Sequence, residues 1–155
     1  MTRQEEMIAG LRGSGYRQTP QRLAIVRILS ADPTHPTVEQ VFHQVQKDFP
    51  TTSLATVYKT IDTLKELGEV QELEFTDGGR RYDAMNVTPH AHLICRDCDA
   101  IEDYDIQVER LRKRAEESST YELTDTRVDF YGRCRKCRGK ATKKSSGRSA
   151  LVGSR

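Results

Sequence analysis

The chain has 155 residues, of which 35% are hydrophobic and 31% charged, and its formal net charge at pH 7 is +2. This length allows one ordinary domain or two small ones and is too short for a large enzyme. It contains no run of about 20 apolar residues, which a membrane-spanning helix needs, and its charged N-terminus lacks the apolar region of a signal peptide. We therefore expect a cytoplasmic protein with no membrane partner.

The first third of the chain predicts helices with recognisable starting residues. Thr19-Pro20 places an N-cap residue before a proline at the first helical position. Thr37 and Gln40 form a capping-box pattern, and Pro50 is expected to end the helix that follows. The apolar residues of that helix recur on one face: Val38, Val41, Phe42, Val45 and Phe49.

A third helix is predicted from Ser53 to Gly68, where the glycine is a C-cap residue. Its inward face is apolar: Val57, Ile61 and Leu64. Its outward face is polar but carries few charges: Thr56, Lys59, Thr60 and Thr63, with Tyr58 at the margin. A merely solvated helix more often carries Glu and Lys, whereas hydroxyls, a lysine and a tyrosine suit phosphates, base edges and thymine methyls. This pattern favours contact with DNA.

Two short alternating segments, VQELEF and RRYD, flank the turn sequence TDGG and predict a β-hairpin. Helices followed by a hairpin are the order of a winged helix-turn-helix domain. A helical bundle of another kind is the alternative.

The pattern changes at Ala84. Strands are predicted in HLIC, around Ile101 and in TRVDFYGRC, and a helix in DIQVERLRKRAEESS. We therefore predict an α+β chain with a DNA-binding domain over residues 1–83, a linker over 84–89 and a second domain over 90–138. Residues 133–155 hold nine Lys and Arg and no acid, and residues 139–155 are expected to form a basic disordered tail.

The cysteines form two CxxC pairs, Cys95/Cys98 and Cys134/Cys137. Four thiolates can complete a closed tetrahedral zinc site of the structural kind. Disulfides are the alternative in a secreted chain, and two unrelated reduced pairs or a redox CxxC are others. Neither pair starts a helix in a βαβ pattern, so the zinc site is preferred.

The histidines are candidate ligands of a second metal site. His90 and His92 lie two residues apart on an extended segment and therefore point to the same side. His35, Asp83 and Asp103 are candidates for further ligands, although each also suits a turn, a strand end or a solvated surface. His43, on the apolar-striped helix, is interpreted as structural.

The segments TPQR, HPT, ATVYKTIDTLKELG, HAHLICRDC, IED and YGRCRKC, in this order and spacing, resemble the ferric uptake regulator family of bacterial metal-dependent repressors. The resemblance covers roughly residues 5–138. It implies a homodimer in which each subunit has an N-terminal winged-helix domain and a C-terminal dimerisation domain. It also implies zinc on the four cysteines and a regulatory metal between the domains.

Within the family, the resemblance to the peroxide-sensing branch assigns Fe²⁺ or Mn²⁺ to His35, Asp83, His90, His92 and Asp103. The iron-sensing branch typically has glutamate at the two carboxylate positions, so the two aspartates favour peroxide sensing. The resemblance implies that hydrogen peroxide oxidises His35 or His90 and that the protein then leaves a palindromic operator. The expected DNA contacts are Arg17, Gln21, Arg22, Ser53, Ala55, Thr56, Tyr58 and Lys59.

Other functions remain open at this point. An iron-responsive repressor of the same family would use the same residues without peroxide chemistry, and zinc- or manganese-responsive relatives are further alternatives. Two His plus a carboxylate can also form an oxygen-activating enzyme site, and a zinc-stapled module need not bind DNA. We expect a regulator that is not an enzyme.

Overall fold

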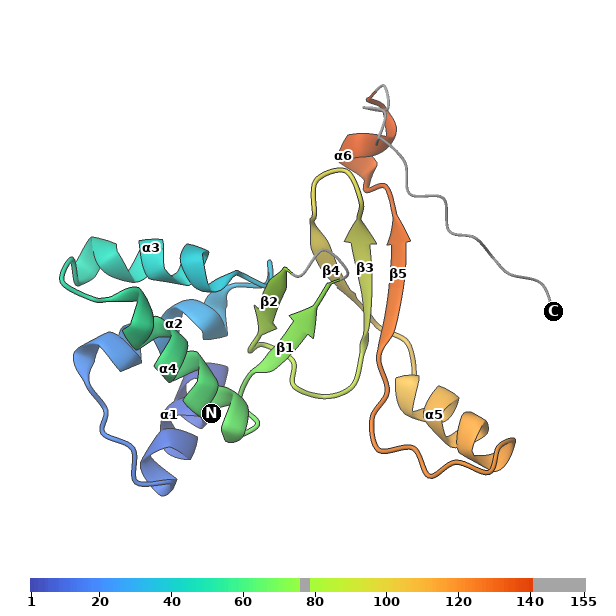
Figure 1. Cartoon of the computed structure of the whole chain (residues 1–155), viewed down its shortest axis with the longest axis horizontal. Helices are drawn as coiled ribbons and strands as arrows, with labels where there is room; N and C mark the ends of the chain where they lie inside the picture. The colour runs from blue at the N-terminus through green and yellow to red at the C-terminus, as the bar shows by residue number, and fades with distance from the viewer. Residues whose placement is uncertain (76–78, 141–155) are drawn as a thin grey trace.

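The computed structural model describes residues 1–75 and 79–140 and has the predicted α+β architecture (Figure 1). The first half contains α1 (Arg3–Gly13), α2 (Pro20–Ala31), α3 (Val38–Asp48), α4 (Leu54–Glu66), β1 (Gln71–Glu74) and β2 (Arg80–Asp83). The second half contains β3 (Ala91–Cys95), β4 (Ile101–Tyr104), α5 (Val108–Glu117), β5 (Val128–Gly132) and α6 (Arg135–Arg138).

The predicted helix starts are confirmed by side-chain caps. The Thr19 and Ser53 side chains accept hydrogen bonds from backbone N–H groups at the starts of α2 and α4, and Thr37 begins α3 with a complete capping box. Gly68, just beyond α4, has a φ of +71°, which glycine adopts without steric cost. Helix α1 was not predicted, although Thr2 and Glu5 form a second capping box that could have indicated it.

The prediction that Thr60 lies on the outward face of α4 is wrong. Thr60 is only 2% exposed, and its hydroxyl donates to the carbonyl of Thr56 over 2.8 Å. Thr60 lies three residues after Val57 and next to Ile61, so it falls on the buried side of the helix. The bond to Thr56 satisfies the hydroxyl without a tertiary partner.

Helices α1 to α4 and the β1–β2 hairpin enclose one hydrophobic core, which includes Leu11, Ile25, Leu29, Val41, Ile61 and Leu64. In the antiparallel hairpin, Gln71 pairs with Asp83. The backbone N–H of Tyr82 donates to the carbonyl of Pro36 over 3.1 Å, and this bond joins β2 to the loop before α3. The hairpin therefore brings the end of β2 close to His35.

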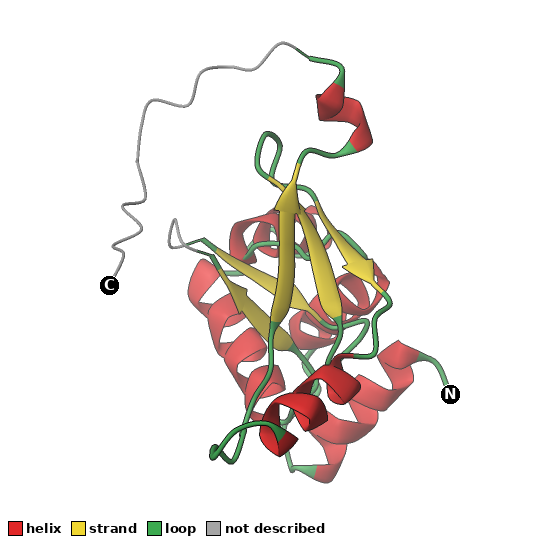
Figure 2. Cartoon of the chain, turned by 90° about the vertical axis from the view of Figure 1, so that its right-hand side faces the viewer, coloured by secondary structure: helices red, strands yellow, loops and turns green. Residues whose placement is uncertain are grey.

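The second half is built on a three-stranded sheet with the order β4-β3-β5 (Figure 2). Strand β3 is antiparallel to β4 and parallel to β5. In this register His92 lies between Asp103 of β4 and Asp129 of β5. Because side chains alternate along a strand, these three residues project from the same sheet face, while Leu93 and Phe130 project from the other.

Parts of two predicted segments lie outside the described residues: positions 76–78 of the hairpin turn and 141–155 of the basic tail. Gly139, at the start of the predicted tail, is the C-cap residue of α6. Across the described ranges, the helices are too short and too polar to cross a lipid bilayer.

Candidate metal centres

Four thiols form the first candidate centre at the far end of the sheet. Cys95 ends β3, Cys98 lies in the next turn, Cys134 is the N-cap residue of α6 and Cys137 lies within α6. Their sulfur atoms lie within 4.8 Å of one another, and the sulfurs of Cys98 and Cys134 are 3.8 Å apart. Tetrahedral zinc with Zn–S bonds of about 2.3 Å places its sulfur atoms about 3.8 Å apart, whereas a disulfide needs about 2.05 Å. The four cysteines are free and fit zinc.

The electrostatics of the thiols also fit a cation. The backbone N–H of Cys134 donates to Cys95 Sγ over 3.3 Å, and this bond lowers the pKa of Cys95 to about 6. Hydrogen bonding with the Cys134 thiol raises the pKa of Cys137 to about 12. Four thiolates this close repel one another, so a divalent cation is needed to hold all of them ionised.

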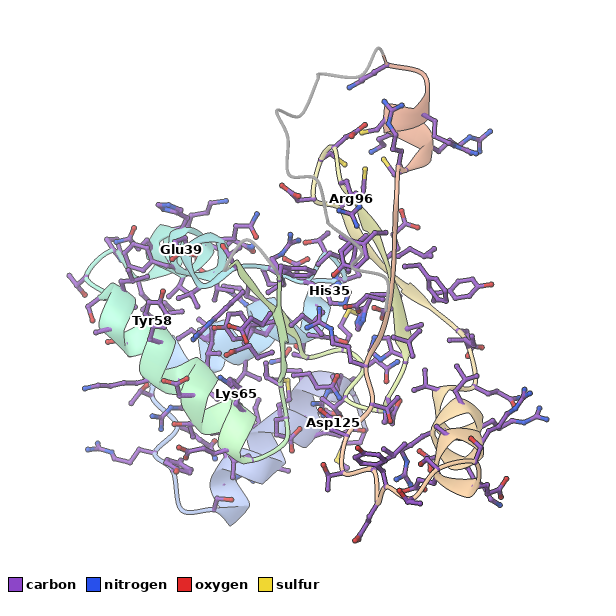
Figure 3. All side chains as sticks on the ribbon, turned by 45° about the vertical axis from the view of Figure 1, so that its right-hand side comes forward. His35, Glu39, Tyr58, Lys65, Arg96 and Asp125 are labelled. Atoms are coloured by element: carbon purple, nitrogen blue, oxygen red, sulfur yellow. The ribbon has the colours of Figure 1, made fainter. Side chains whose placement is uncertain are left out.

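The second candidate centre contains His35, Asp83, His90, His92 and Asp103, whose ligand atoms also lie within 4.8 Å of one another. His35 comes from the loop before α3 and Asp83 from the end of β2, whereas the other three come from β3, β4 and the segment just before β3. In Figure 3, His35 lies between the helices and the three-stranded sheet. The structure thus brings together all the residues that the resemblance had assigned to a regulatory metal.

The contacts within this cluster are short. Nε2 of His35 lies 2.8 Å from Asp103 Oδ1 and 3.7 Å from Asp83 Oδ2. Nε2 of His90 lies 3.1 Å and 3.3 Å from the same two oxygen atoms. The rings of His90 and His92 have centroids 4.5 Å apart.

Two polar atoms that face away from the centre of the cluster have hydrogen-bond partners in the backbone. Nδ1 of His90 lies 2.8 Å from the carbonyl of Thr88. Asp83 Oδ1 accepts from the backbone N–H groups of Met85 and Asn86 over 2.9 and 3.1 Å. These bonds hold the backbone after β2 in a turn and leave Asp83 Oδ2 directed at the histidines.

The inner atoms are buried without hydrogen-bond partners. Both ring nitrogens of His35, Nε2 of His92 and Oδ2 of Asp83 are in this state, and even the 2.8 Å contact of His35 lacks hydrogen-bond geometry. Buried polar atoms without partners cost free energy. Three imidazoles and two carboxylates that converge in this way fit a metal ion, which would satisfy them together.

The cluster also shifts the pKa values of its members. Burial lowers the pKa of His35, but Asp83 and Asp103 more than offset this and leave it raised. Burial raises the pKa of Asp83, but the interaction with His35 and the hydrogen bond from the backbone N–H of Asn86 outweigh burial. The pKa of Asp83 is therefore lowered from its usual value. Burial, together with the neighbouring His90 and His35, lowers the pKa of His92. The carboxylates therefore favour positive charge here, and His92 favours the neutral form that binds metals.

The backbone at His35 has a φ of 56°, in the left-handed region that non-glycine residues rarely adopt. Such a conformation costs on the order of 1 kcal/mol or more and needs support from its surroundings. Arg81 gives this support: it donates to the carbonyls of Thr34, over 2.6 Å, and of His35. It also donates over 3.0 Å to the carbonyl of Asp99, which has a φ of 58° in the turn after Cys98.

Two residues beside the cluster were not singled out from the sequence. Arg81 lies in the predicted hairpin strand RRYD, and Asp129 in the predicted last strand TRVDFYGRC. Nδ1 of His92 lies 3.3 Å from Asp129 Oδ1. Only the pairing register of β3 and β5 places Asp129 there, and a single sequence does not contain that register.

The residues expected to contact DNA lie in the segments that begin α2 and α4, and Tyr58 of α4 lies on the far side of the first half from the three-stranded sheet in Figure 3. Ser53, Ala55, Tyr58 and Lys59 are exposed, as is Arg17 before α2, while Thr56, Gln21 and Arg22 are half-buried. Part of the Arg22 side chain is used within the protein, because it donates to the Arg17 carbonyl over 2.7 Å. These DNA contacts stay a prediction.

Comparisons with known proteins agree with this arrangement. The sequence profile of the Ferric uptake regulator family matches residues 13–131. The chain is 38% identical over 137 residues to the peroxide-responsive repressor PerR of Staphylococcus aureus (strain USA300), which covers 88% of this chain and 92% of that protein. The Campylobacter jejuni peroxide stress regulator superposes with a TM-score of 0.66 at 30% identity, covering 86% of this chain and 97% of the other. A zinc-bound manganese uptake regulator superposes with a TM-score of 0.67 at 29% identity, with 83% and 98% covered.

The four-thiol cluster predicts that Cys134→Ser lowers both zinc content and stability. Zinc binding contributes on the order of 10 kcal/mol in small zinc domains, and three thiolates hold the ion less tightly than four. We expect substoichiometric zinc by plasma mass spectrometry and loss of cooperative thermal unfolding in the second half of the chain. Ser119→Ala, in an exposed position, is the control. Full zinc content and unchanged unfolding in Cys134→Ser would contradict the zinc assignment.

Proposed function

The chain belongs to the Ferric uptake regulator family, and we propose that it is a dimeric repressor that releases operator DNA when hydrogen peroxide oxidises its regulatory metal centre. The observation that carries the proposal is the His/Asp cluster: five ligand groups from both halves of the chain, all but Asp103 buried or half-buried and several with polar atoms that lack hydrogen-bond partners. The identity to a peroxide-responsive repressor supports the same assignment.

We assign a structural zinc ion to the four cysteines and a regulatory Fe²⁺ or Mn²⁺ to the His/Asp cluster. Zinc prefers thiolates in a closed tetrahedron, whereas imidazoles mixed with carboxylates suit iron and manganese. The relatives support both metals, since one structure is of a zinc-bound manganese uptake regulator and another is of a ferric uptake regulator with iron. The three imidazoles and two carboxylates of the cluster would hold this ion.

The regulatory site joins the two halves of the subunit. His35 and Asp83 belong to the proposed DNA-binding domain, residues 1–83, and His90, His92 and Asp103 to the proposed dimerisation domain, residues 90–138. Complete coordination requires one relative position of these domains. In a dimer that position sets the separation of the two α4 helices, and two half-sites one helical turn apart require about 34–36 Å. The proposed operator is therefore palindromic double-stranded DNA.

The proposed dimer interface is the sheet face opposite the metal cluster. Phe130 is 44% and Leu93 is 39% exposed there, and the ring of Tyr104 meets that of Phe130 edge-on at 6.1 Å. Large exposed apolar groups that share one sheet face mark an interaction surface. A second copy that covers this face would bury them and leave α4 free for DNA.

The peroxide reaction is proposed from the chemistry of the ligands. Fe²⁺, when bound, would supply the redox chemistry that activates hydrogen peroxide beside the imidazole rings, and the net two-electron oxidation falls on one of those rings. Asp103 is 42% exposed on its side chain and lines a hollow with Pro33, Thr34 and Arg81, so a small oxidant can approach the cluster from this side. Net insertion of one oxygen atom into His35 or His90 gives 2-oxo-histidine, and the second peroxide oxygen leaves as water. The oxidised ring is a poorer ligand, which frees the domains to move.

The dimer assignment predicts that Phe130→Arg weakens dimerisation. An arginine on the exposed sheet face would place an unpaired charge in the interface, at a cost of several kcal/mol. We expect monomer at micromolar concentration by sedimentation velocity, where the unchanged chain is a dimer. Arg110→Gln on α5 is a control. A Phe130→Arg protein that remains a dimer to the same dilution would place the interface elsewhere.

The peroxide assignment predicts different responses from the iron and manganese forms. Mn²⁺ holds the same ligands but does not readily reduce peroxide. Peroxide should therefore abolish operator binding of the Fe²⁺ form in a gel-shift assay and leave the Mn²⁺ form bound. Mass spectrometry of the Fe²⁺ sample should find one added oxygen in the peptide that contains His35 or in the one that contains His90.

Asp103→Glu is the matched variant for this experiment, because it keeps the carboxylate and changes its reach. We expect it to bind metal and to oxidise more slowly. Equal peroxide sensitivity of the Fe²⁺ and Mn²⁺ forms would rule out the proposed chemistry. An Fe²⁺ form that binds DNA and ignores peroxide would instead indicate an iron-responsive repressor, which the likeness to ferric uptake regulator structures favours as the second candidate.

A further inference from the structure

Strand β5 places an acidic side chain behind the regulatory cluster. Asp129 pairs in register with His92, and its Oδ1 lies 3.3 Å from Nδ1 of that ring. The Asp129 side chain is 12% exposed and the His92 side chain 4%. Nε2 of His92, on the opposite edge of the ring, is buried without a hydrogen-bond partner and belongs to the metal-binding group.

The second oxygen of Asp129 continues the chain of contacts toward the hairpin. Asp129 Oδ2 lies 2.7 Å from Nε of Arg127. The same guanidinium donates over 2.7 Å to the carbonyl of Glu74, the last residue of β1, and lies over the ring of Phe75 at 5.4 Å. Four groups are thus linked in order: the His92 ring, the Asp129 carboxylate, the Arg127 guanidinium and the end of β1.

We propose that Asp129 and Arg127 are positioning residues that connect metal binding at His92 to the β1–β2 hairpin. This inference rests on the proposed function, since it presumes a metal on the His/Asp cluster. Asp129 accepts the Nδ1 hydrogen of His92 and thereby presents the bare Nε2 to the cluster. Arg127 fixes Asp129 from the other side and ties it to β1. A shift of the His92 ring is then transmitted to the hairpin through two charged contacts.

The chemistry of metal-bound histidine supports the first link. A ring nitrogen binds a metal only when it carries no hydrogen, and the hydrogen bond made by the other nitrogen decides which one that is. The removal of such a carboxylate partner typically lowers metal affinity about 10- to 100-fold. His90 has a different partner for its Nδ1, the Thr88 carbonyl, so the role of Asp129 is confined to His92.

The second link reaches strand β1, the neighbour of the strand β2 that carries Asp83 and Arg81. Strand β1 is joined to β2 by the hairpin ladder, and β1 contributes none of the cluster residues. The hydrogen bond from Arg127 to Glu74 therefore connects the second half of the chain directly to strand β1. Its length is that of a well-formed charge-assisted hydrogen bond.

The test uses full-length, zinc-loaded protein with two test substitutions and two controls, and Asp129→Glu serves as the rescue variant. Asp129→Asn keeps the size of the side chain, but its amide can turn an N–H donor toward His92 Nδ1. Arg127→Gln removes the guanidinium and leaves Asp129 in place. Asp125→Asn, at an exposed position before β5, and Arg110→Gln, on the surface of α5, are matched controls for the two changes of charge.

Three measurements separate positioning from general stability. Long-range ¹⁵N correlation spectra of histidine-labelled protein without manganese report which nitrogen of His92 carries the hydrogen. Titration with Mn²⁺ gives the affinity. Hydrogen–deuterium exchange with and without Mn²⁺ reports the protection of the peptide that contains β1. The thermal unfolding of each variant is also measured, so that a variant that fails to fold is recognised.

We expect Nδ1–H on His92 in the unchanged protein and a mixture of both forms in Asp129→Asn. We expect Mn²⁺ affinity to fall about 10- to 100-fold in Asp129→Asn and by less than about threefold in Arg127→Gln. Arg127→Gln should lose most of the Mn²⁺-dependent protection of β1, and both controls should retain it. Asp129→Glu, which restores the carboxylate, should recover part of the affinity.

Two results would overturn the inference while the metal site stands. One is unchanged Mn²⁺ affinity and ring form in a folded Asp129→Asn protein, and the other is full protection of β1 by Mn²⁺ in Arg127→Gln. If the unchanged protein binds no Mn²⁺, the proposed regulatory site fails and this inference fails with it.

Discussion

The structure depends on the convergence of five polar side chains at the junction of its two halves. His35, Asp83 and His92 are almost fully buried there, yet several of their polar atoms lack hydrogen-bond partners. Such an arrangement costs free energy in the protein alone and becomes favourable once a cation completes it. In the function proposed above, metal affinity and the relative position of the halves are linked, because the same contacts would determine both.

Two arginines beside this junction, Arg81 and Arg127, hydrogen-bond to backbone carbonyls of neighbouring segments. Arg81 ties the His35 loop to the turn that follows Cys98, and Arg127 ties β5 to the end of β1. The first of these contacts connects the regulatory cluster with the zinc centre, since Asp99 follows a zinc-ligand candidate directly. The same guanidinium therefore holds the two backbone segments with positive φ, at His35 and at Asp99. The two candidate metal centres are thus connected through Arg81.

Much of this arrangement could be predicted from the sequence because its signals are local. Caps, apolar spacing and CxxC pairs each lie within a few residues, so they identified α2 to α4, the hairpin and the four thiols. Thr60 was placed wrongly because a hydroxyl at the edge of the buried face looks polar in sequence but can bond to its own helix. The meeting of His35 with Asp103 depends on tertiary packing, so only the family resemblance suggested it. The position of Asp129 beside His92 depends on the register of β3 and β5, and neither residue spacing nor the family resemblance indicated it.

The most direct test of the account counts the nitrogen ligands of the regulatory metal. Electron spin-echo spectroscopy of the zinc-loaded chain with one Mn²⁺ per subunit detects imidazole nitrogens bound to manganese. The cluster contains three histidines, two from the β3 region and His35 from the first half of the chain. We predict three bound imidazoles in the unchanged protein and two in His35→Ala. An identical nitrogen count in both proteins would show that His35 does not bind the metal, which would contradict the account.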